Sequence, residues 1–271
     1  MLEQYRRNII NCPHIIFADI IRRSDIIFIR VVTIPVFLLS ELFMKNTERE
    51  SQINLGPLDI HGILAVAGIV GPLVLIALDL TAAFAMPKYD IIRDTISSLA
   101  LTSMGWIQTI GFLVIGLLIE IFTAGLFLNI KRRRGFGFGI LLLALFGFGM
   151  LLIGAFRTDP VGGPATVNGR IHLVGAYGVL GLFPVSVAML LSSIRNDPRW
   201  RGMFRYSAVT GIIAFGLAVG RLFLPYLSWF GLYERLTVAN AIGWVEVSAV
   251  WLLLLSLKRQ REVETTDGVP E

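Results

Sequence analysis

The sequence has few of the side chains on which most soluble proteins and metal enzymes depend. Charged residues make up 16% of its 271 residues, against about 25% in soluble domains. The single cysteine, Cys12, excludes an intrachain disulfide and a multi-cysteine metal cluster. The three histidines, His14, His61 and His172, are too scattered for a His-x-x-x-His metal pair. We therefore expect no metal site and no cofactor.

Apolar residues are correspondingly abundant, at 55% of the chain, and the mean hydropathy is +0.73. A soluble fold could not surround that much apolar sequence with polar surface, so the chain is expected to lie in a membrane. The net charge of +5 and the isoelectric point near 9.7 fit cations gathered in cytoplasmic loops. The sequence shows no zinc-finger spacing and no basic strand studded with aromatics, so nucleic acid is not an expected partner.

A transmembrane helix needs about 20 mainly apolar residues to cross about 30 Å of hydrocarbon. Each such stretch must be helical, because lipid offers the backbone no hydrogen-bond partners. The predicted fold class is therefore all-α, a polytopic membrane helix bundle with six transmembrane helices. The six stretches lie at 62–86, 105–130, 136–156, 171–194, 206–227 and 236–257.

Basic residues predict the orientation of this six-helix domain, residues 62–257. If residue 61 is cytoplasmic, the inner segments hold 13 Lys and Arg residues and the outer loops hold 5. Such an excess is typical of cytoplasmic loops. We therefore expect a multi-pass protein of the plasma membrane with a cytoplasmic leader, 44–61, and a charged cytoplasmic tail, 258–271.

The first 43 residues have an atypical composition, with ten isoleucines and no glycine. Their apolar stretch, 26–44, could be a seventh span, but that would place Arg22 and Arg23 outside, against the rule that fits the other loops. An interfacial amphipathic helix is one interpretation. The other is a mis-assigned start, with Met44 beginning a conventional polar leader. N-terminal sequencing of the natively expressed protein distinguishes the two.

Several glycines are spaced so that they share a helix face. Small residues at such spacing let membrane helices approach closely. We interpret the following pairs as packing residues: Gly68 with Gly71, Gly178 with Gly181, and Gly216 with Gly220.

The first outer loop is amphipathic at helical spacing over residues 88–101, which predicts a surface helix that covers the end of the bundle. Its apolar face would carry Ile91, Ile92, Thr95, Ile96 and Leu99, and its polar face Asp90, Arg93, Asp94 and Ser97. We take these polar residues, with Arg170 of the second outer loop, as candidate ligand-binding residues. The alternative is that Arg93 only pairs with Asp90 and Asp94 on a solvated face.

The second outer loop, residues 156–172, combines Asp159-Pro160, a Gly-Gly-Pro turn, Arg170 and His172. Proline and glycine impose turns here and place His172 at the mouth of the fourth span. Asp159 and His172 are a candidate acid/base pair.

The motifs of the two outer loops resemble those of one family. Tyr89-Asp90, then Arg93-Asp94-Thr95-Ile96-Ser97 with Leu99, and later Thr158-Asp159-Pro160 with His172, are similar to the prokaryotic membrane family called domain of unknown function 998. The resemblance covers about residues 60–258. It implies a bundle of six or slightly more helices and supplies no activity.

Four ionisable residues fall inside the predicted spans, namely Asp79, Glu120, Arg221 and Glu246. An ionisable group that faces lipid is costly, so we expect these to be buried charges facing the bundle interior. The hypothesis is that Arg221 pairs with Asp79, with Glu246 or with both.

Three classes of function fit these features. In the first, an outer-facing polar pocket binds or processes a lipid-like amphiphile, with Arg93 or Arg221 holding an anionic headgroup. In the second, the set Asp79, Arg221 and Glu246 serves proton- or ion-coupled transport. In the third, the protein is a non-catalytic scaffold subunit of a membrane complex. The first is preferred, with membrane lipid as the expected partner; whether the protein is an enzyme, and its oligomeric state, stay open.

Overall fold

The computed structural model describes residues 58–223 and 228–267, all within one compact unit of the chain, Gly56–Glu271. This described part is all-helical, and six of its helices are long and apolar enough to cross a membrane. The predicted fold class is therefore confirmed; the expectations for residues 1–43 and for most of the leader 44–61 fall outside the described residues. The elements are α4 (Ile60–Ala85), η2 (Ile96–Leu101), α5 (Gly105–Asn129), α6 (Phe136–Ala155), α7 (Val167–Asn196), η3 (Arg201–Met203), α8 (Phe204–Phe223) and α9 (Phe230–Asp267).

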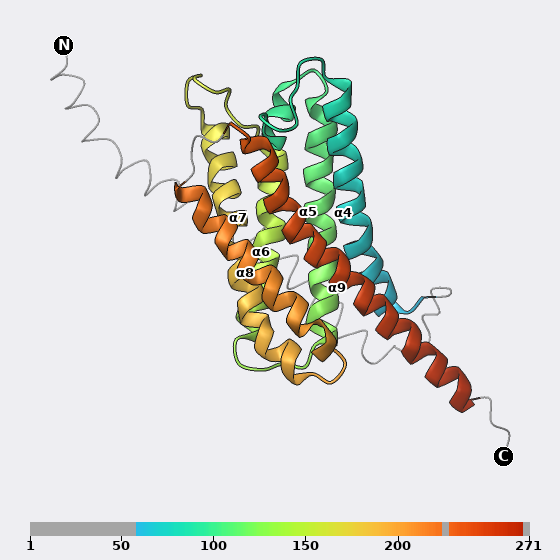
Figure 1. Cartoon of the computed structure of the whole chain (residues 1–271). Coiled ribbons are helices and arrows are strands. Elements are labelled where there is room, and N and C mark those ends of the chain that lie inside the picture. The colour runs from blue at the N-terminus through green and yellow to red at the C-terminus, as the bar shows by residue number, and fades with distance from the viewer. Residues whose placement is uncertain (1–57, 224–227, 268–271) are drawn as a thin grey trace, which may run out of the picture. The chain divides into compact units, whose positions relative to one another are not determined.

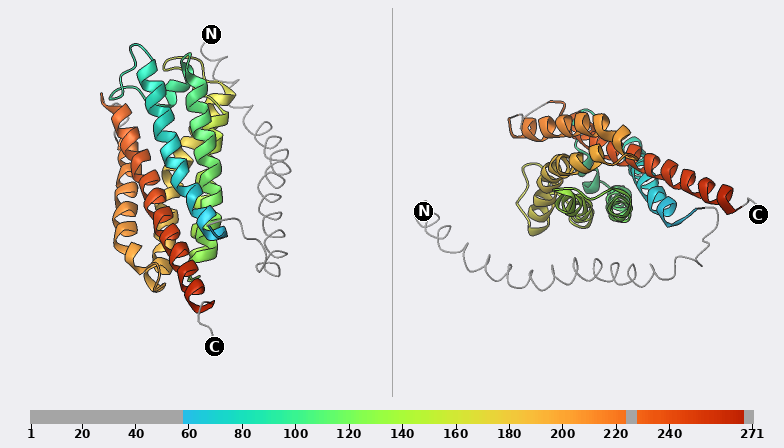
Figure 2. Two further views of the ribbon diagram at one scale, coloured as in Figure 1. Left: turned by 90° about the vertical axis from the view of Figure 1, so that its right-hand side faces the viewer. Right: turned by 90° about the horizontal axis from the view of Figure 1, so that it is seen from below.

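The six long helices form a ring. Each helix from α4 to α8 packs against the next one along the chain, and α9 closes the ring by packing against both α8 and α4 (Figures 1 and 2). The C-terminal part of α9 continues past the end of the other helices. The last helix in the sequence therefore lies beside the first described one.

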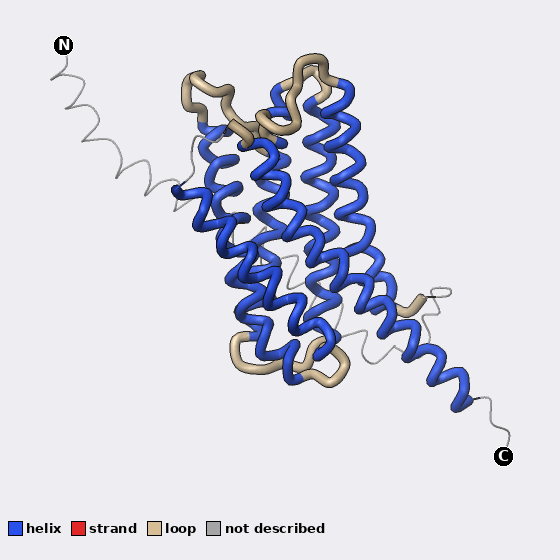
Figure 3. Tube along the Cα trace, viewed as in Figure 1, coloured by secondary structure: helices blue, strands red, loops and turns tan. Residues whose placement is uncertain are grey.

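Connections gather at the two ends of the ring, as the tan segments of Figure 3 show. One end carries residues 86–104 and 156–166, and we call it the site end. The other carries residues 130–135 and 197–203. It includes the run Lys131–Arg134, so we call it the basic end.

Side chains cap several helices where they begin. The Asp59 carboxylate accepts from the backbone N–H of Gly62 at 2.8 Å at the start of α4, and the Thr166 hydroxyl accepts from Gly169 N at 3.0 Å at the start of α7. These oxygens satisfy N–H groups that have no partner within the helix. Gly135, with φ 86°, is in the left-handed region that favours glycine and turns the chain into α6.

The basic end is organised by Asp197 and Asn129. The Asp197 carboxylate accepts from the backbone N–H groups of Lys131 at 2.8 Å and Arg199 at 2.9 Å. Burial by itself would raise the pKa of Asp197, but these N–H groups and the Arg199 guanidinium outweigh it and hold the pKa below its ordinary value. The carbonyl of Asn129 accepts from both Arg199 and Trp200. The connection over residues 197–203 is therefore hydrogen-bonded to the end of α5.

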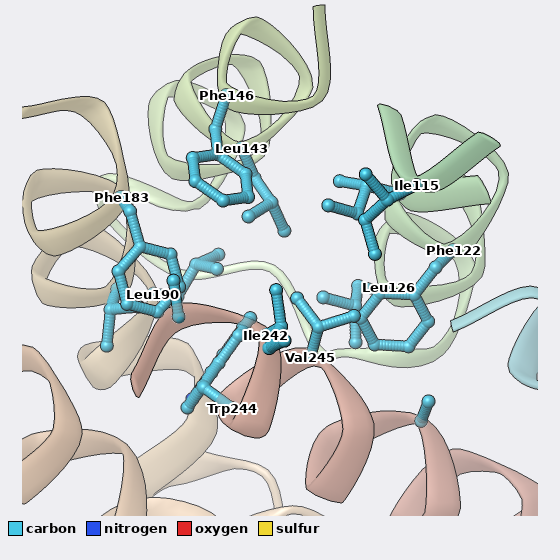
Figure 4. Packing of buried hydrophobic residues seen from close by; sticks show 14 of the residues in the cluster. Ile115, Phe122, Leu126, Leu143, Phe146, Phe183, Leu190, Ile242, Trp244 and Val245 are labelled. Carbon is cyan, nitrogen blue, oxygen red and sulfur yellow. The ribbon is translucent and has the colours of Figure 1, made fainter. Parts of the chain in front are cut away.

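The core lies on the inner faces of the ring. Phe122, Leu126, Trp244 and Val245 are at most 1% exposed and meet side chains of the opposite helices (Figure 4). The outer faces are apolar as well, because large side chains such as Leu73, Phe84, Ile212 and Phe215 are exposed. A helix that is apolar on all sides is typical of a membrane span. The apolar side chains on the inner faces of the helices therefore form the core, and those on the outer faces are available to contact lipid.

The glycine pairs have different roles. A Cβ added at Gly68 would lie 2.6 Å from the ring of Phe122 and 2.7 Å from Cβ of Ala249, and one at Gly71 would lie 3.1 Å from Ile115. This pair packs closely, as predicted. Around Gly181 and Gly216 no atom of the described residues lies within 4 Å of such a Cβ, and at Gly178 the nearest is a carbon of Leu182 at 3.9 Å. The packing interpretation is wrong for Gly178, Gly181 and Gly216, because these glycines do not face a closely packed neighbouring helix; for Gly220 it stays a prediction.

Gly68→Ala tests the closeness of α4, α5 and α9. We expect it to lower the free energy of unfolding by about 1–3 kcal/mol, because overpacking a fully packed contact costs that much. Gly181→Ala is the matched control and should be neutral or stabilising, since alanine favours helix and meets open space. Unfolding in mixed micelles measures both; equal stabilities for the two variants would contradict the packing.

Candidate functional site

The connection over residues 86–104 does not form the predicted surface helix. Residues 91–93 form turns and residue 94 a bend, and a 3-10 helix, η2, begins at Ile96. Side chains compete with the helical backbone here: Asp90 accepts from Ile92 N at 2.9 Å, and Asp94 accepts from Asp90 N at 2.8 Å. Thr95 then caps η2 by accepting from Ser98 N at 3.1 Å. Helical spacing of apolar residues could not reveal this local competition.

Arg235 of α9 holds this connection in place. Its Nη2 donates to the hydroxyl of Tyr89 at 2.7 Å, and its Nε lies 3.4 Å from an oxygen of Asp79 on α4. Its Nη1 donates to the carbonyls of Ile91 at 2.9 Å and Asp94 at 3.0 Å. We call this group the Arg235 clamp: Asp79, Tyr89, Arg235 and the two carbonyls. It joins two helices and one connection through a single guanidinium.

Tyr89 extends the clamp along the chain. Its hydroxyl donates to the carbonyl of Thr95 at 2.8 Å and lies 3.1 Å from that of Asp94. Burial raises the pKa of Tyr89 to about 12, although Arg235 opposes the shift. The hydroxyl therefore keeps its proton at neutral pH and can donate to these carbonyls while it accepts from Arg235.

The start of α9 lies directly against the same connection. Gly231 N donates to the Arg93 carbonyl at 3.2 Å and Leu232 N to that of Ile92 at 2.9 Å. A Cβ at Gly231 would lie 2.2 Å from the carbonyl oxygen of Asp94, so only glycine allows this approach. Free N–H groups of the helix terminus thus find their acceptors in the connection.

The predicted pairing of Arg221 with Asp79 or Glu246 is wrong. Among the described residues Asp79 pairs with Arg235, whereas the Arg221 guanidinium lies 4.5 Å from the ring centre of Phe230 and 5.7 Å from that of Tyr177. Of the four predicted buried charges, Asp79 is buried and Glu120, Arg221 and Glu246 are half-buried. The set invoked for transport is therefore not one ion-paired cluster.

The catalytic candidates Asp159 and His172 are not hydrogen-bonded to each other. Asp159 accepts from the Thr166 hydroxyl at 2.7 Å and from Thr166 N at 2.9 Å. These bonds, with the Thr166 hydroxyl first, hold the pKa of Asp159 below its ordinary value. A Cβ at Gly169 would lie 2.0 Å from this carboxylate, which sits tightly over the start of α7. Asp159 shapes the second connection and does not orient the imidazole.

His172 contacts Ser97 instead. Its Nε2 lies 3.0 Å from the Ser97 hydroxyl, and its Nδ1 lies 2.8 Å from the Phe156 carbonyl and 3.2 Å from that of Ile153. On the other side of Ser97, Glu234 accepts from Ile96 N at 2.7 Å, with its second oxygen 3.4 Å from the Ser97 hydroxyl. Ser97 thus lies between a histidine of α7 and a glutamate of α9.

A cavity of about 250 Å³ lies below these residues. Ser97, His172, Glu234 and Arg221 line it together with Tyr177. The rest of the wall is mostly apolar and includes Phe146, Phe183 and Ile242, which Figure 4 shows within the core. The cavity therefore has a polar part at the site end and an apolar part that reaches into the bundle.

The predicted ligand-binding residues divide into two groups. Ser97 lines the cavity, but Asp90, Arg93, Asp94 and Arg170 do not. Arg93 is 75% exposed and pairs with Asp90 at 3.5 Å, which agrees with the solvated-face alternative. The sequence did not reveal Glu234 and Arg235, because both lie between the spans predicted at 206–227 and 236–257, whereas α9 already begins at Phe230.

The comparison with protein families gives one finding. The family model for proteins of unknown function (DUF998) matches residues 69–251. The chain belongs to this family and is an integral membrane protein with six apolar helices in its described part. No curated protein and no solved structure matches the chain.

Arg235→Lys tests the clamp. Lysine keeps the charge but lacks the fork that reaches Tyr89, Asp79 and two carbonyls. Since hydrogen bonds to charged groups contribute about 1.5–3 kcal/mol each, the amides of Gly231 and Leu232, which donate to the connection, should exchange with deuterium about ten- to a hundredfold faster. Arg93→Lys, at an exposed pair, is the matched control. Unchanged exchange in Arg235→Lys would contradict the clamp.

Proposed function

We propose that the protein binds a lipid-like amphiphile in the cavity at the site end. The composition of the cavity wall supports this proposal most directly. Ser97, His172 and Arg221 lie at its polar part, and apolar side chains from five helices form the rest. An amphiphile needs both kinds of surface in one site, and ligand pockets commonly combine an apolar wall with a few placed polar groups. The guanidinium of Arg221 suits an anionic headgroup.

The exposure of part of the cavity wall on α7 supports entry from the membrane. At Gly211 a Cβ would lie 3.2 Å from Val187, so α7 and α8 touch there. Toward the site end the cavity wall includes Leu173 and Tyr177 of α7, and both side chains are exposed on the outside of the described bundle.

The size of the cavity favours partial burial of the ligand. Its volume of about 250 Å³ is below the range of about 300–1,000 Å³ that holds a drug-sized molecule. We expect one headgroup and the first part of one chain inside, with the remaining chain in the bilayer beside α7.

Ala176→Phe tests the proposal by filling the cavity from α7, where Ala176 lines it. Native mass spectrometry of protein released from nanodiscs should show a retained lipid on the wild type and at least a tenfold lower bound fraction on this variant. Ala188→Phe is the matched control, because Ala188 is exposed on the same helix, and it should retain the lipid. Equal lipid retention by both variants would overturn the proposal.

The proposal includes an orientation in the plasma membrane. The basic end carries Lys131 and Arg132–Arg134, and Arg259 of α9 lies at the same end, where it donates to the Asn129 side chain at 3.3 Å. Basic residues accumulate on the cytoplasmic side, so the C-terminus would be cytoplasmic and the cavity would open near the outer leaflet.

Single-cysteine labelling tests this orientation in a Cys12→Ser background. Ala165→Cys, exposed at the site end, should react with a membrane-impermeant maleimide in whole cells, whereas Arg133→Cys, exposed at the basic end, should react only after lysis. The reverse pattern would contradict the orientation but leave the lipid site in place.

A further inference from the structure

Ser97 and His172 have the geometry of a nucleophile and its general base. The imidazole Nδ1 faces two carbonyl oxygens, of Phe156 at 2.8 Å and of Ile153 at 3.2 Å. Carbonyl oxygens only accept hydrogen bonds, so Nδ1 carries the proton of the neutral ring. The lone pair of Nε2 is then directed at the Ser97 hydroxyl, 3.0 Å away.

The hydroxyl proton of Ser97 has two acceptors within reach, and the distances favour one. Nε2 of His172 is 3.0 Å from the hydroxyl oxygen, whereas the Glu234 oxygen is 3.4 Å away. The second distance is outside the usual range of about 2.5–3.0 Å for O–H···O bonds. Ser97 therefore donates to His172, and Glu234 instead fixes the backbone beside it by accepting from Ile96 N at 2.7 Å.

The pair is placed where a ligand would meet it. Both side chains line the cavity, and His172 is only 4% exposed, so the imidazole is held from two sides inside the bundle. A nucleophile hydrogen-bonded to a base, which a third group orients, is the arrangement that activates serine in acyl transfer. Here the Phe156 carbonyl takes the place of the orienting carboxylate.

We infer that Ser97 is an acyl-accepting nucleophile that cleaves ester bonds of amphiphiles bound in the cavity, with His172 as its base. This inference rests on the proposed function. Ser97 Oγ bonds to the ester carbonyl carbon, its proton passes to His172 Nε2, and the bond to the alcohol oxygen breaks as that oxygen takes the proton. Water then attacks the acyl-serine with His172 again as base, which releases the carboxylic acid and restores Ser97.

A long-chain alkyl fluorophosphonate tests this step on the full chain in nanodiscs. Such a probe forms a phosphorus–oxygen bond to an activated serine as its phosphorus–fluorine bond breaks. We expect one adduct per chain, located on Ser97 by peptide mass spectrometry. No adduct on the wild type, or an adduct on another residue, would overturn the inference. This experiment uses only the wild-type protein, so its result does not depend on whether a variant folds.

Variants then test the roles of the two residues. Ser97→Ala should abolish labelling, and Ser98→Ala, the matched control on the neighbouring residue, should label as the wild type does. His172→Gln should label about 10²- to 10⁴-fold more slowly, the usual contribution of a general base. Hydrolysis of 4-nitrophenyl octanoate should follow the same order, and labelling that is independent of His172 would overturn its role as base.

Lipid retention separates this inference from the proposed function. The wild type is therefore measured in both assays, for retained lipid by native mass spectrometry and for the fluorophosphonate adduct on Ser97. If the wild type retains lipid but does not react with the fluorophosphonate, the role of Ser97 as a nucleophile is overturned and the lipid-binding function stands. Labelling of Ser97 in a protein that retains no lipid would overturn the lipid-binding function and leave an esterase-type site of another substrate class.

Discussion

The arrangement of the site end depends on the mostly buried guanidinium of Arg235. The side chain of Arg235 is 15% exposed, and a charge in such a place is tolerated only with a counter-charge and further hydrogen bonds. Asp79 supplies the charge from α4, and Tyr89 with two carbonyls supplies the bonds from the connection. Satisfying Arg235 therefore fixes how the first and last described helices and the chain between 89 and 95 meet.

The position of the candidate site follows from this constraint. Glu234 precedes Arg235 on α9 and accepts from Ile96 N, so the same turn of helix that holds the connection also places Ser97. His172 reaches Ser97 from α7, where the Phe156 carbonyl holds its ring. Polar side chains from separate helices thus converge above an otherwise apolar cavity. In a bundle that otherwise exposes apolar side chains to lipid, a polar cluster of this kind is an expected place for function.

The sequence predicted the architecture well because hydropathy reports burial in lipid directly. The span predicted at 105–130 is α5, Gly105–Asn129, and that predicted at 136–156 is α6, Phe136–Ala155. The positions of charged residues are less informative. Arg235 falls just before the span predicted at 236–257 and is therefore one of the five basic residues assigned to outer loops. Hydropathy cannot distinguish a charge in a loop from a paired charge in the first turns of a helix. Ser97 and His172 are both candidate residues from the sequence, but their contact depends on tertiary packing between two residues 75 positions apart in the chain. No local pattern encodes that distance.

A double-mutant cycle between Asp79→Leu and Arg235→Met tests most directly whether the site end depends on this pair. Each single change leaves one buried charge without its partner, whereas the double change removes both charges. We expect the double variant to be less destabilised than the sum of the single variants, with a coupling of about 0.5–3 kcal/mol in the free energy of unfolding in mixed micelles. Additivity within about 0.3–0.5 kcal/mol would contradict this expectation, because Arg235 and Asp79 would then act independently.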